Sequence, residues 1–238
     1  MRRLPLLACI AVSTTIFAQG ASAADMPVKA PPAPVAPPPY NWTGFYVGGH
    51  AGYFWGRTRV EEDGVVTEPN AKTNGFVGGV LGGYNWQTGP VVLGIEGDFG
   101  WTNAHGTGVA TPPAPTVITT QLPNQYDVNW TSHVRGRLGY AADRWLFFVA
   151  GGLAIADFNF QEGAIITTVI PPPQVPGAIF VGWSIGGGIE YAITQNILAR
   201  AEFLYDNFGH KDYIGSDGDP YRARLTGSTA RGALAWKF

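Results

Sequence analysis

The carboxyl-terminal stretch, residues 225–238, alternates strictly between two kinds of side chain. One face carries Leu234, Trp236 and Phe238, whereas the other carries small or cationic side chains. Successive side chains of a β-strand point to opposite faces, so this period of two predicts a strand. A strand with one apolar and one small, polar face is typical of the boundary between lipid and a narrow lumen. Because an unpaired sheet edge is too costly in hydrocarbon, such a strand must belong to a closed barrel.

Further segments of the chain show the same alternation: residues 44–57, 75–87, 91–101, 128–140, 145–157, 179–193 and 197–208. Segment 145–157 is apolar on both faces, so its register stays open. The chain has 33 glycines and only 13% charged residues, a composition that favours many Gly-punctuated strands over a helical bundle. The sequence therefore predicts an all-β fold: an eight-stranded antiparallel up-and-down transmembrane β-barrel.

The connections between these segments alternate in length. Three are tight hairpins, at residues 88–90, 142–144 and 194–196. Four are long and polar or Pro-rich, at residues 58–74, 103–127, 159–178 and 209–220. Short turns on one rim and long loops on the other are typical of outer-membrane barrels.

The aromatic residues form two predicted belts, as expected where amphipathic rings favour the membrane interfaces. The periplasmic belt comprises Trp42, Phe45, Tyr84, Trp86, Tyr140, Trp145, Tyr191, Trp236 and Phe238. The outer belt comprises Tyr53, Trp55, Phe76, Phe99, Trp101, Trp130, Phe180, Trp183 and Tyr205.

The segments before the barrel indicate export. Residues 1–23 have a basic start, an apolar stretch and small residues at the cleavage position, as in a Sec-type signal peptide. Residues 24–41 form a Pro/Ala-rich periplasmic linker, and residues 42–238 the barrel. Removal of the signal leaves 13 Lys and Arg against 17 Asp and Glu, a net charge of −4, so nucleic acid is not expected as a partner. Cys9 lies in the signal, which leaves no thiol in the mature chain.

The predicted lumen face carries acids and bases in equal number. They are Glu96, Asp98, Glu190, Glu202 and Asp206 with Arg135, Arg137, Arg200, Arg231 and Lys237. An eight-stranded barrel is only wide enough for side chains to fill, and unpaired buried charges are costly, so we expect these residues to pair as a plug. The alternative is a narrow or gated polar pore whose selectivity they set.

No catalytic, metal or cofactor site is predicted. Ser132 and His133 are neighbours in a strand and therefore point to opposite faces, so they cannot form a dyad. Arg222 and Arg224 have the lipid-facing parity of Phe238 but lie towards the outside, where they could contact lipopolysaccharide phosphates.

Two resemblances add to these predictions. The ending Trp236-Lys237-Phe238 resembles the assembly signal of bacterial outer-membrane barrels, which implies recognition of Trp236 and Phe238 by the barrel-assembly machinery. Residues 41–49, NWTGFYVGG, resemble alphaproteobacterial outer-membrane immunogenic proteins, as do GGY at 82–84, GIEGD at 94–98 and RGRLGY at 135–140. This resemblance implies a small porin-like barrel of the OmpA transmembrane type.

Together these observations predict a monomeric, non-enzymatic protein of the Gram-negative outer membrane, in contact with outer-membrane lipid and lipopolysaccharide. Its predicted role is structural, with a plugged lumen and exposed surface loops. A narrow passive channel for small solutes and a loop-based adhesin or surface-recognition protein remain the alternatives.

Overall fold

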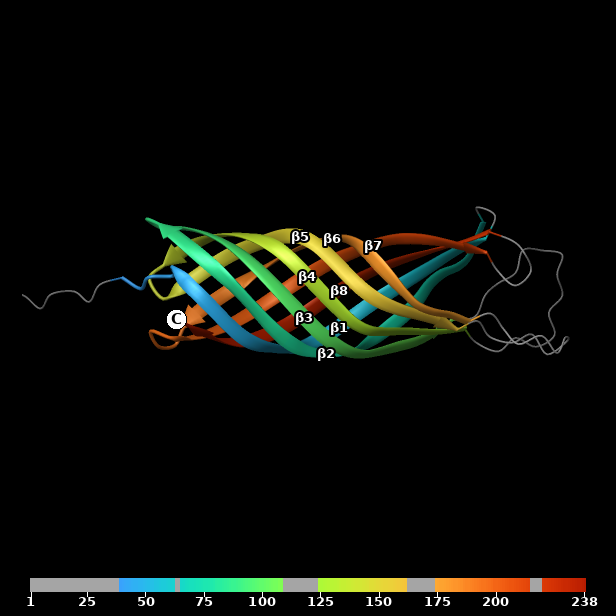
Figure 1. Cartoon of the computed structure of the whole chain (residues 1–238), viewed down its shortest axis with the longest axis horizontal. Coiled ribbons are helices and arrows are strands. Elements are labelled where there is room, and N and C mark those ends of the chain that lie inside the picture. Colours follow the sequence, from blue (N-terminus) through green and yellow to red (C-terminus); the bar gives the residue numbers. More distant parts are fainter. Residues whose placement is uncertain (1–38, 63–64, 109–123, 162–173, 215–219) are drawn as a thin grey trace, which may run out of the picture. The chain divides into compact units, whose positions relative to one another are not determined.

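The structure is a computed structural model that describes residues 39–62, 65–108, 124–161, 174–214 and 220–238. These residues form a closed barrel in which each strand pairs with the next and β1 pairs with β8 (Figure 1). All the pairings are antiparallel, so the predicted fold class is confirmed. No helix in these ranges is long and apolar enough to cross a membrane. The predicted signal peptide and most of the predicted linker lie outside the described residues.

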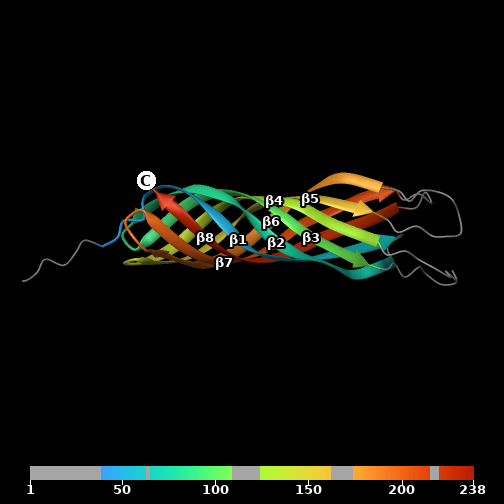
Figure 2. The ribbon, with the colours of Figure 1, turned by 90° about the horizontal axis from the view of Figure 1, so that it is seen from below.

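The strands are β1 (Gly44–Glu62), β2 (Val65–Thr88), β3 (Val91–Gly108), β4 (Asn124–Ala142), β5 (Trp145–Gln161), β6 (Gln174–Ala192), β7 (Ile197–Ile214) and β8 (Pro220–Lys237). The three short turns, the start of β1 and the carboxyl terminus lie at one end of the barrel (Figures 1 and 2). The strands are tilted relative to the long axis of the barrel (Figure 2), as closure of a small barrel requires.

The strands are longer at the other end than the sequence predicted. Segment 58–74, for example, was expected to be a loop but supplies the end of β1 and the start of β2. Backbone pairing continues there from Arg57 opposite Lys72 to Glu62 opposite Val65. The prediction failed because the outward side chains beyond the outer belt are polar, so the contrast in hydrophobicity between the faces disappears although the backbone ladder continues.

Side chains alternate between an outward apolar face and a buried inward face along each strand. In β5, whose register was open, Phe147, Val149 and Leu153 point outward, whereas Phe148 and Ala150 point inward. Most predicted belt residues are outward and pack in rows, such as Phe99 against Trp130, with ring centroids 5.4 Å apart.

Two predicted belt residues are inward instead. Phe180 is buried against Phe158, with ring centroids 5.4 Å apart. It has the inward parity of Gly182 and Ser184, whereas Val181 and Trp183 point outward. Trp42 precedes β1 and is completely buried. Both were misplaced because aromatic content alone does not reveal the face of the barrel.

The interior is stacked in three layers along the barrel. The layer nearest the short turns is apolar and aromatic and contains Tyr40, Trp42, Tyr46, Leu81, Val92, Leu146, Ala192, Leu198 and Ala235. The middle layer holds buried charges. The layer towards the long connections is again apolar and includes Phe54, Tyr126, Phe158, Phe180, Phe208 and Leu225. The charged residues predicted for the lumen therefore occupy only its middle, between two apolar layers.

Candidate functional site: the barrel lumen

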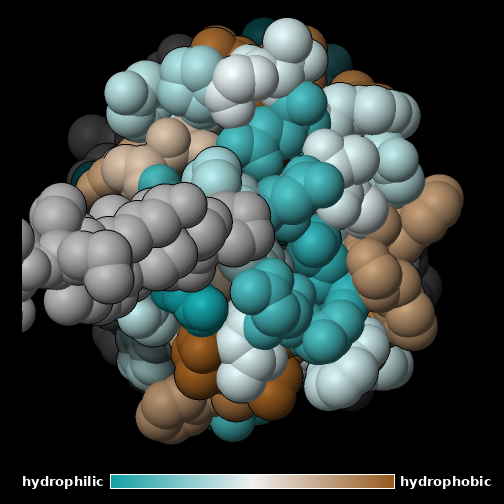
Figure 3. All heavy atoms as spheres, turned by 90° about the vertical axis from the view of Figure 1, so that its left-hand side faces the viewer, coloured by the Kyte–Doolittle hydropathy of each residue, from teal (hydrophilic) through white to brown (hydrophobic). Residues whose placement is uncertain are grey.

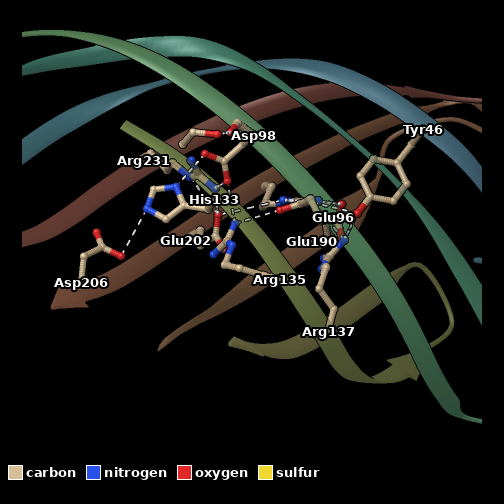
Figure 4. A network of polar contacts seen from close by, with 12 residues as sticks. Tyr46, Glu96, Asp98, His133, Arg135, Arg137, Glu190, Glu202, Asp206 and Arg231 are labelled. Carbon is tan, nitrogen blue, oxygen red and sulfur yellow. Dashed lines mark hydrogen bonds and ion pairs between the residues drawn. The ribbon is translucent and has the colours of Figure 1, made fainter. Parts of the chain in front are cut away.

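The middle layer is a buried network of ion pairs and hydrogen bonds (Figure 4). Its members come from β1, β3, β4, β6, β7 and β8: Tyr46, Glu96, Asp98, His133, Arg135, Arg137, Glu190, Arg200, Glu202, Asp206 and Arg231. Every one of these side chains is almost completely inaccessible to solvent. Strand pairing alone brings many of them together, because opposite charges face each other across the ladders. These facing pairs are Glu96 with Arg135, Asp98 with His133, Glu190 with Arg200, and Glu202 with Arg231.

Arg135 contacts three carboxylates. Its Nη1 donates to Glu202 Oε1 at 2.7 Å, and its Nη2 donates to Glu96 Oε1 at 2.9 Å and to Asp98 Oδ2 at 3.2 Å. Arg231 reinforces this contact set, since it donates to Glu202 Oε2 at 2.9 Å and to Asp98 Oδ2 at 3.0 Å. Strands β3, β4, β7 and β8 are thereby tied together through the lumen. Charge-assisted bonds of this kind are the strongest that side chains make.

A second contact set lies on the side of the short turns. Arg137 Nη2 is 2.6 Å from Glu190 Oε2, and Arg200 Nη1 is 2.6 Å from Glu96 Oε2. The Tyr46 hydroxyl donates to Glu96 Oε2 and accepts from Arg137 Nη1, both at 2.7 Å. The Arg137 guanidinium also lies 4.2 Å from the ring centroid of Phe148, a cation–π contact.

His133 lies between two acidic side chains (Figure 4). Its Nδ1 is 2.8 Å from Asp98 Oδ1, and its Nε2 forms a 3.3 Å ion pair with Asp206 Oδ1 that lacks hydrogen-bond geometry. The network thus contains four arginines and five carboxylates, with His133 placed between two of these carboxylates.

The structure brings together nine of the ten residues predicted for this network and leaves Lys237 apart. Lys237 lies at the end of β8, where its Nζ is 5.0 Å from the ring centroid of Tyr40. Sequence reasoning assigned it by parity alone, although its distance along the strand places it at the mouth.

Two members of the network were not predicted, Tyr46 and His133. Both signals were in the sequence. His133 shares the parity of Arg135 and Arg137, and Tyr46 has the parity opposite to the lipid-facing Phe45.

A short segment before β1 closes the end of the lumen nearest the short turns. The Trp42 backbone N donates to Gln87 Oε1 at 2.7 Å, and its indole Nε1 donates to the Asp143 carbonyl at 3.1 Å. The Tyr40 hydroxyl donates to the Gln195 carbonyl at 3.0 Å. The segment thereby contacts all three hairpins at or next to their turns. Hydrophilic side chains gather across this end, with apolar side chains around its edge (Figure 3).

The chemistry of this lumen is that of paired charges. Within the described ranges, no group of three or more His, Cys, Asp or Glu side chains is arranged to hold a metal ion. Ser132 Oγ donates to the Asp98 carbonyl at 2.8 Å, whereas the neighbouring His133 ring points into the lumen. The two side chains therefore do not form a nucleophile–base pair.

Comparisons with known proteins agree with this architecture. The family model of the outer membrane protein beta-barrel domain matches residues 9–238. The chain belongs to this family. It is therefore an outer-membrane protein, as the alternation predicted.

Two relatives of this outer-membrane barrel are themselves named as outer-membrane proteins. The 31 kDa outer-membrane immunogenic protein of Brucella melitensis biotype 1 is 33% identical over 249 residues, which cover 98% of each chain. The 22 kDa outer membrane protein of Rhizobium leguminosarum bv. viciae is 32% identical over 181 residues, covering 76% of this chain and 71% of that protein. The resemblance to alphaproteobacterial immunogenic proteins is thereby confirmed. Among solved structures, Pseudomonas aeruginosa OprG has the same type of fold, with a TM-score of 0.53 at 9% identity, covering 84% of this chain and 98% of that chain.

The other predicted site residues of this outer-membrane barrel lie on its outward face. Trp236 and Phe238 are exposed near the short turns, with Phe238 72% exposed. Arg222 and Arg224 are exposed at the other end. Arg222 is neutralised by Asp212, since Nε donates to Oδ1 at 2.7 Å, whereas Arg224 lies opposite Arg59 of β1.

Proposed function

We propose that this protein is a structural barrel with a sealed lumen, whose role is to span the outer membrane and hold loops at the cell surface. The observation that carries this proposal is the stacking of three filled layers: the segment with Tyr40 and Trp42, the ion-pair network, and the aromatic cluster around Phe54 and Phe158. The interior of an eight-stranded barrel is just wide enough for side chains to fill or for one small ligand, and here side chains fill it. A solute would have to displace all three layers.

The network is a poor gate for a second reason. Arg135, Arg137 and Arg200 each contact at least two carboxylates, so no single rotamer change opens a path. Separation of buried charges without new partners is costly. The relatives named above are described as outer-membrane or immunogenic proteins, which supports a non-enzymatic surface role.

A planar-bilayer recording of the refolded barrel tests the proposal. We expect no steady conductance from the wild-type protein, with folding verified by heat-modifiable gel migration. A steady open current from fully folded wild-type protein would overturn the sealed barrel and favour the narrow solute channel.

Surface recognition by the loops is a second candidate function. It is supported by the length of the strands, because β1 continues for seven residues beyond Trp55 of the outer belt, or roughly 23 Å of extended chain. The described end of β1 thereby extends well beyond the outer aromatic belt. Deletion of individual loops should abolish binding to a host or bacterial surface without loss of heat-modifiable migration. Unchanged binding after deletion of every long loop would exclude this role.

A further inference from the structure

Basic side chains gather on one sector of the outward face, just beyond the outer aromatic belt. Arg57 and Arg59 of β1, Lys72 of β2 and Arg224 of β8 are all exposed there, and we call these four residues the cationic row. Strand register sets them in two facing pairs, Arg57 opposite Lys72 and Arg59 opposite Arg224. Four positive charges thus share neighbouring strands.

Like charges that face each other across a strand pair destabilise a sheet. Within the described part of the chain, the carboxylates offset little of this repulsion. Arg59 Nε lies 3.3 Å from Glu61 Oε1, and no ion pair joins Arg57, Lys72 or Arg224 to an acid whose side chain the structure describes. An external anion with several negative charges would remove the repulsion.

Among the described residues, the outward face of β4 and β5 carries acids at this end instead. The corresponding outer parts of β4 and β5 carry Asp127 and Asp157, and Asp157 Oδ2 accepts a 2.8 Å hydrogen bond from Asn129. An anionic headgroup would therefore be attracted to one sector and repelled from the other.

The depth of the cationic row matches the headgroup region of a membrane. Arg57 and Arg59 lie two and four residues beyond Trp55, or about 7 Å and 13 Å along the strand. Tryptophan belts mark the boundary between hydrocarbon and headgroups. The row is therefore where lipid phosphates lie in the outer leaflet.

A shallow apolar groove lies next to the cationic row, on the side of the row that faces the membrane centre. Its floor consists of small outward side chains of three adjacent strands, such as Ala51, Ala201, Ala230 and Gly232. Larger side chains form its walls, namely Tyr53, Phe76, Ile189 and Phe203. Its volume is about 920 Å³. The floor of the groove and the cationic row share β8, on which Thr226 and Ser228 connect Arg224 with Ala230.

We propose that the outward face of β1, β2, β7 and β8 binds a phosphorylated glycolipid of the outer leaflet, with its sugar phosphates on the cationic row and its acyl chains in the groove. Charged arginines recognise phosphate through paired hydrogen bonds. The small floor residues let saturated chains approach the backbone closely. The sequence predicted lipopolysaccharide contact at Arg222 and Arg224. The site proposed here keeps Arg224, adds Arg57, Arg59 and Lys72, and leaves out Arg222, which is paired with Asp212. The proposal holds whether or not the lumen conducts.

The test uses the full mature chain, refolded in detergent without lipid, and native mass spectrometry with defined lipids. The probes are bis-phosphorylated lipid A, its fully dephosphorylated form and phosphatidylglycerol. We expect lipid A to bind best, and the triple variant Arg57→Gln/Arg59→Gln/Arg224→Gln to lower its affinity about tenfold. The matched control Asp212→Asn/Arg222→Gln removes a neighbouring ion pair without changing the net charge and should bind as wild type does.

The groove is tested separately with Ala230→Leu/Gly232→Leu. A Cβ at Gly232 would meet only the Arg200 carbonyl at 3.7 Å, an ordinary contact, so the larger side chain fits on the outward face. This variant should weaken binding of lipid A and leave binding of its deacylated phosphosugar unchanged. The proposal is overturned if the folded triple variant binds lipid A as wild type does, or if phosphatidylglycerol or dephosphorylated lipid A binds equally well.

Discussion

Arg135 and Glu202 are joined across the lumen by a 2.7 Å hydrogen bond between strands that are not neighbours, β4 and β7. Backbone ladders hold each strand to its two neighbours only. A side-chain bond that crosses the lumen therefore adds resistance to flattening and opening of the barrel, which the ladders alone do not provide.

Loss of Arg135 should be strongly destabilising. Arg135→Ala removes one of the cationic partners of Glu202, Glu96 and Asp98, and removal of one member of a buried ion pair costs about 3–5 kcal/mol. The free energy of unfolding in urea, measured in lipid vesicles, checks this value. The double variant Arg135→Ala/Glu202→Gln should recover part of the loss, because it restores the balance of buried charge while the side-chain oxygen of the introduced glutamine can still accept from Arg231. A loss below about 1 kcal/mol for the single variant would show that these pairs contribute little.

Removal of the Trp42 side chain should open the end near the short turns. Trp42 is completely buried, and truncation of a buried aromatic residue to alanine costs about 3–5 kcal/mol. We expect Trp42→Ala to lower the free energy of unfolding and to raise the exposure of Tyr40 to water-soluble quenchers. Trp86→Ala is the matched control, because Trp86 lies on the lipid-facing side and is 53% exposed. Equal effects of the two substitutions would contradict a closing role for Trp42.

The contribution of Tyr40 should depend on pH. Burial of its hydroxyl, together with the negative charge of Glu190, raises the pKa of Tyr40 to about 12, although Arg144 opposes the shift. Because the pKa is higher in the folded state, the unfolded chain ionises first, near its ordinary value of about 10. The stability that Tyr40 contributes is therefore fully present below pH 10 and is lost as the pH rises to about 12.

Tyr40→Phe isolates this effect from the other tyrosines. The variant lacks the hydroxyl and its bond to Gln195, so it should be less stable than wild type at pH 8. The difference in unfolding midpoint between the two proteins should shrink between pH 10 and pH 12. A difference that stays constant over this interval would mean that the Tyr40 hydroxyl ionises normally.

Phe238 should matter for assembly in the cell and not for the stability of the finished barrel. Its side chain is exposed, whereas its backbone N donates to the Phe45 carbonyl at 2.9 Å, a bond that any residue makes. If the ending is an assembly signal, Phe238→Ala should reduce the heat-modifiable protein in the outer-membrane fraction several-fold and leave refolding in vitro unchanged. Trp86→Ala serves as the control. If Phe238→Ala lowers assembly in the cell and refolding in vitro equally, Phe238 has a structural role instead.

The sequence predicted the fold because period two, turn length and belt position are all local signals. The period of two placed Glu96 on the lumen face and Ile95 on the lipid face. Pairing of β3 with β4 then sets Glu96 beside its partner Arg135. The sequence could not predict contacts that depend on height along the barrel. Lys237 and Arg231 share a parity, yet only Arg231 reaches the acids of the middle layer. The extension of β1 and β2 past Arg57 was also missed, since backbone pairing outside the membrane needs no hydrophobic contrast.

The segment before β1 is synthesised early, whereas the turn to which Tyr40 bonds is synthesised much later. The Tyr40 hydroxyl bonds to a carbonyl 155 residues further along the chain, in the turn between β6 and β7. Ring closure between β1 and β8 also joins the two ends of the described barrel. The Tyr40 bond to Gln195 requires the turn between β6 and β7 to be in place, so we expect this segment to close the lumen only after the hairpins have formed.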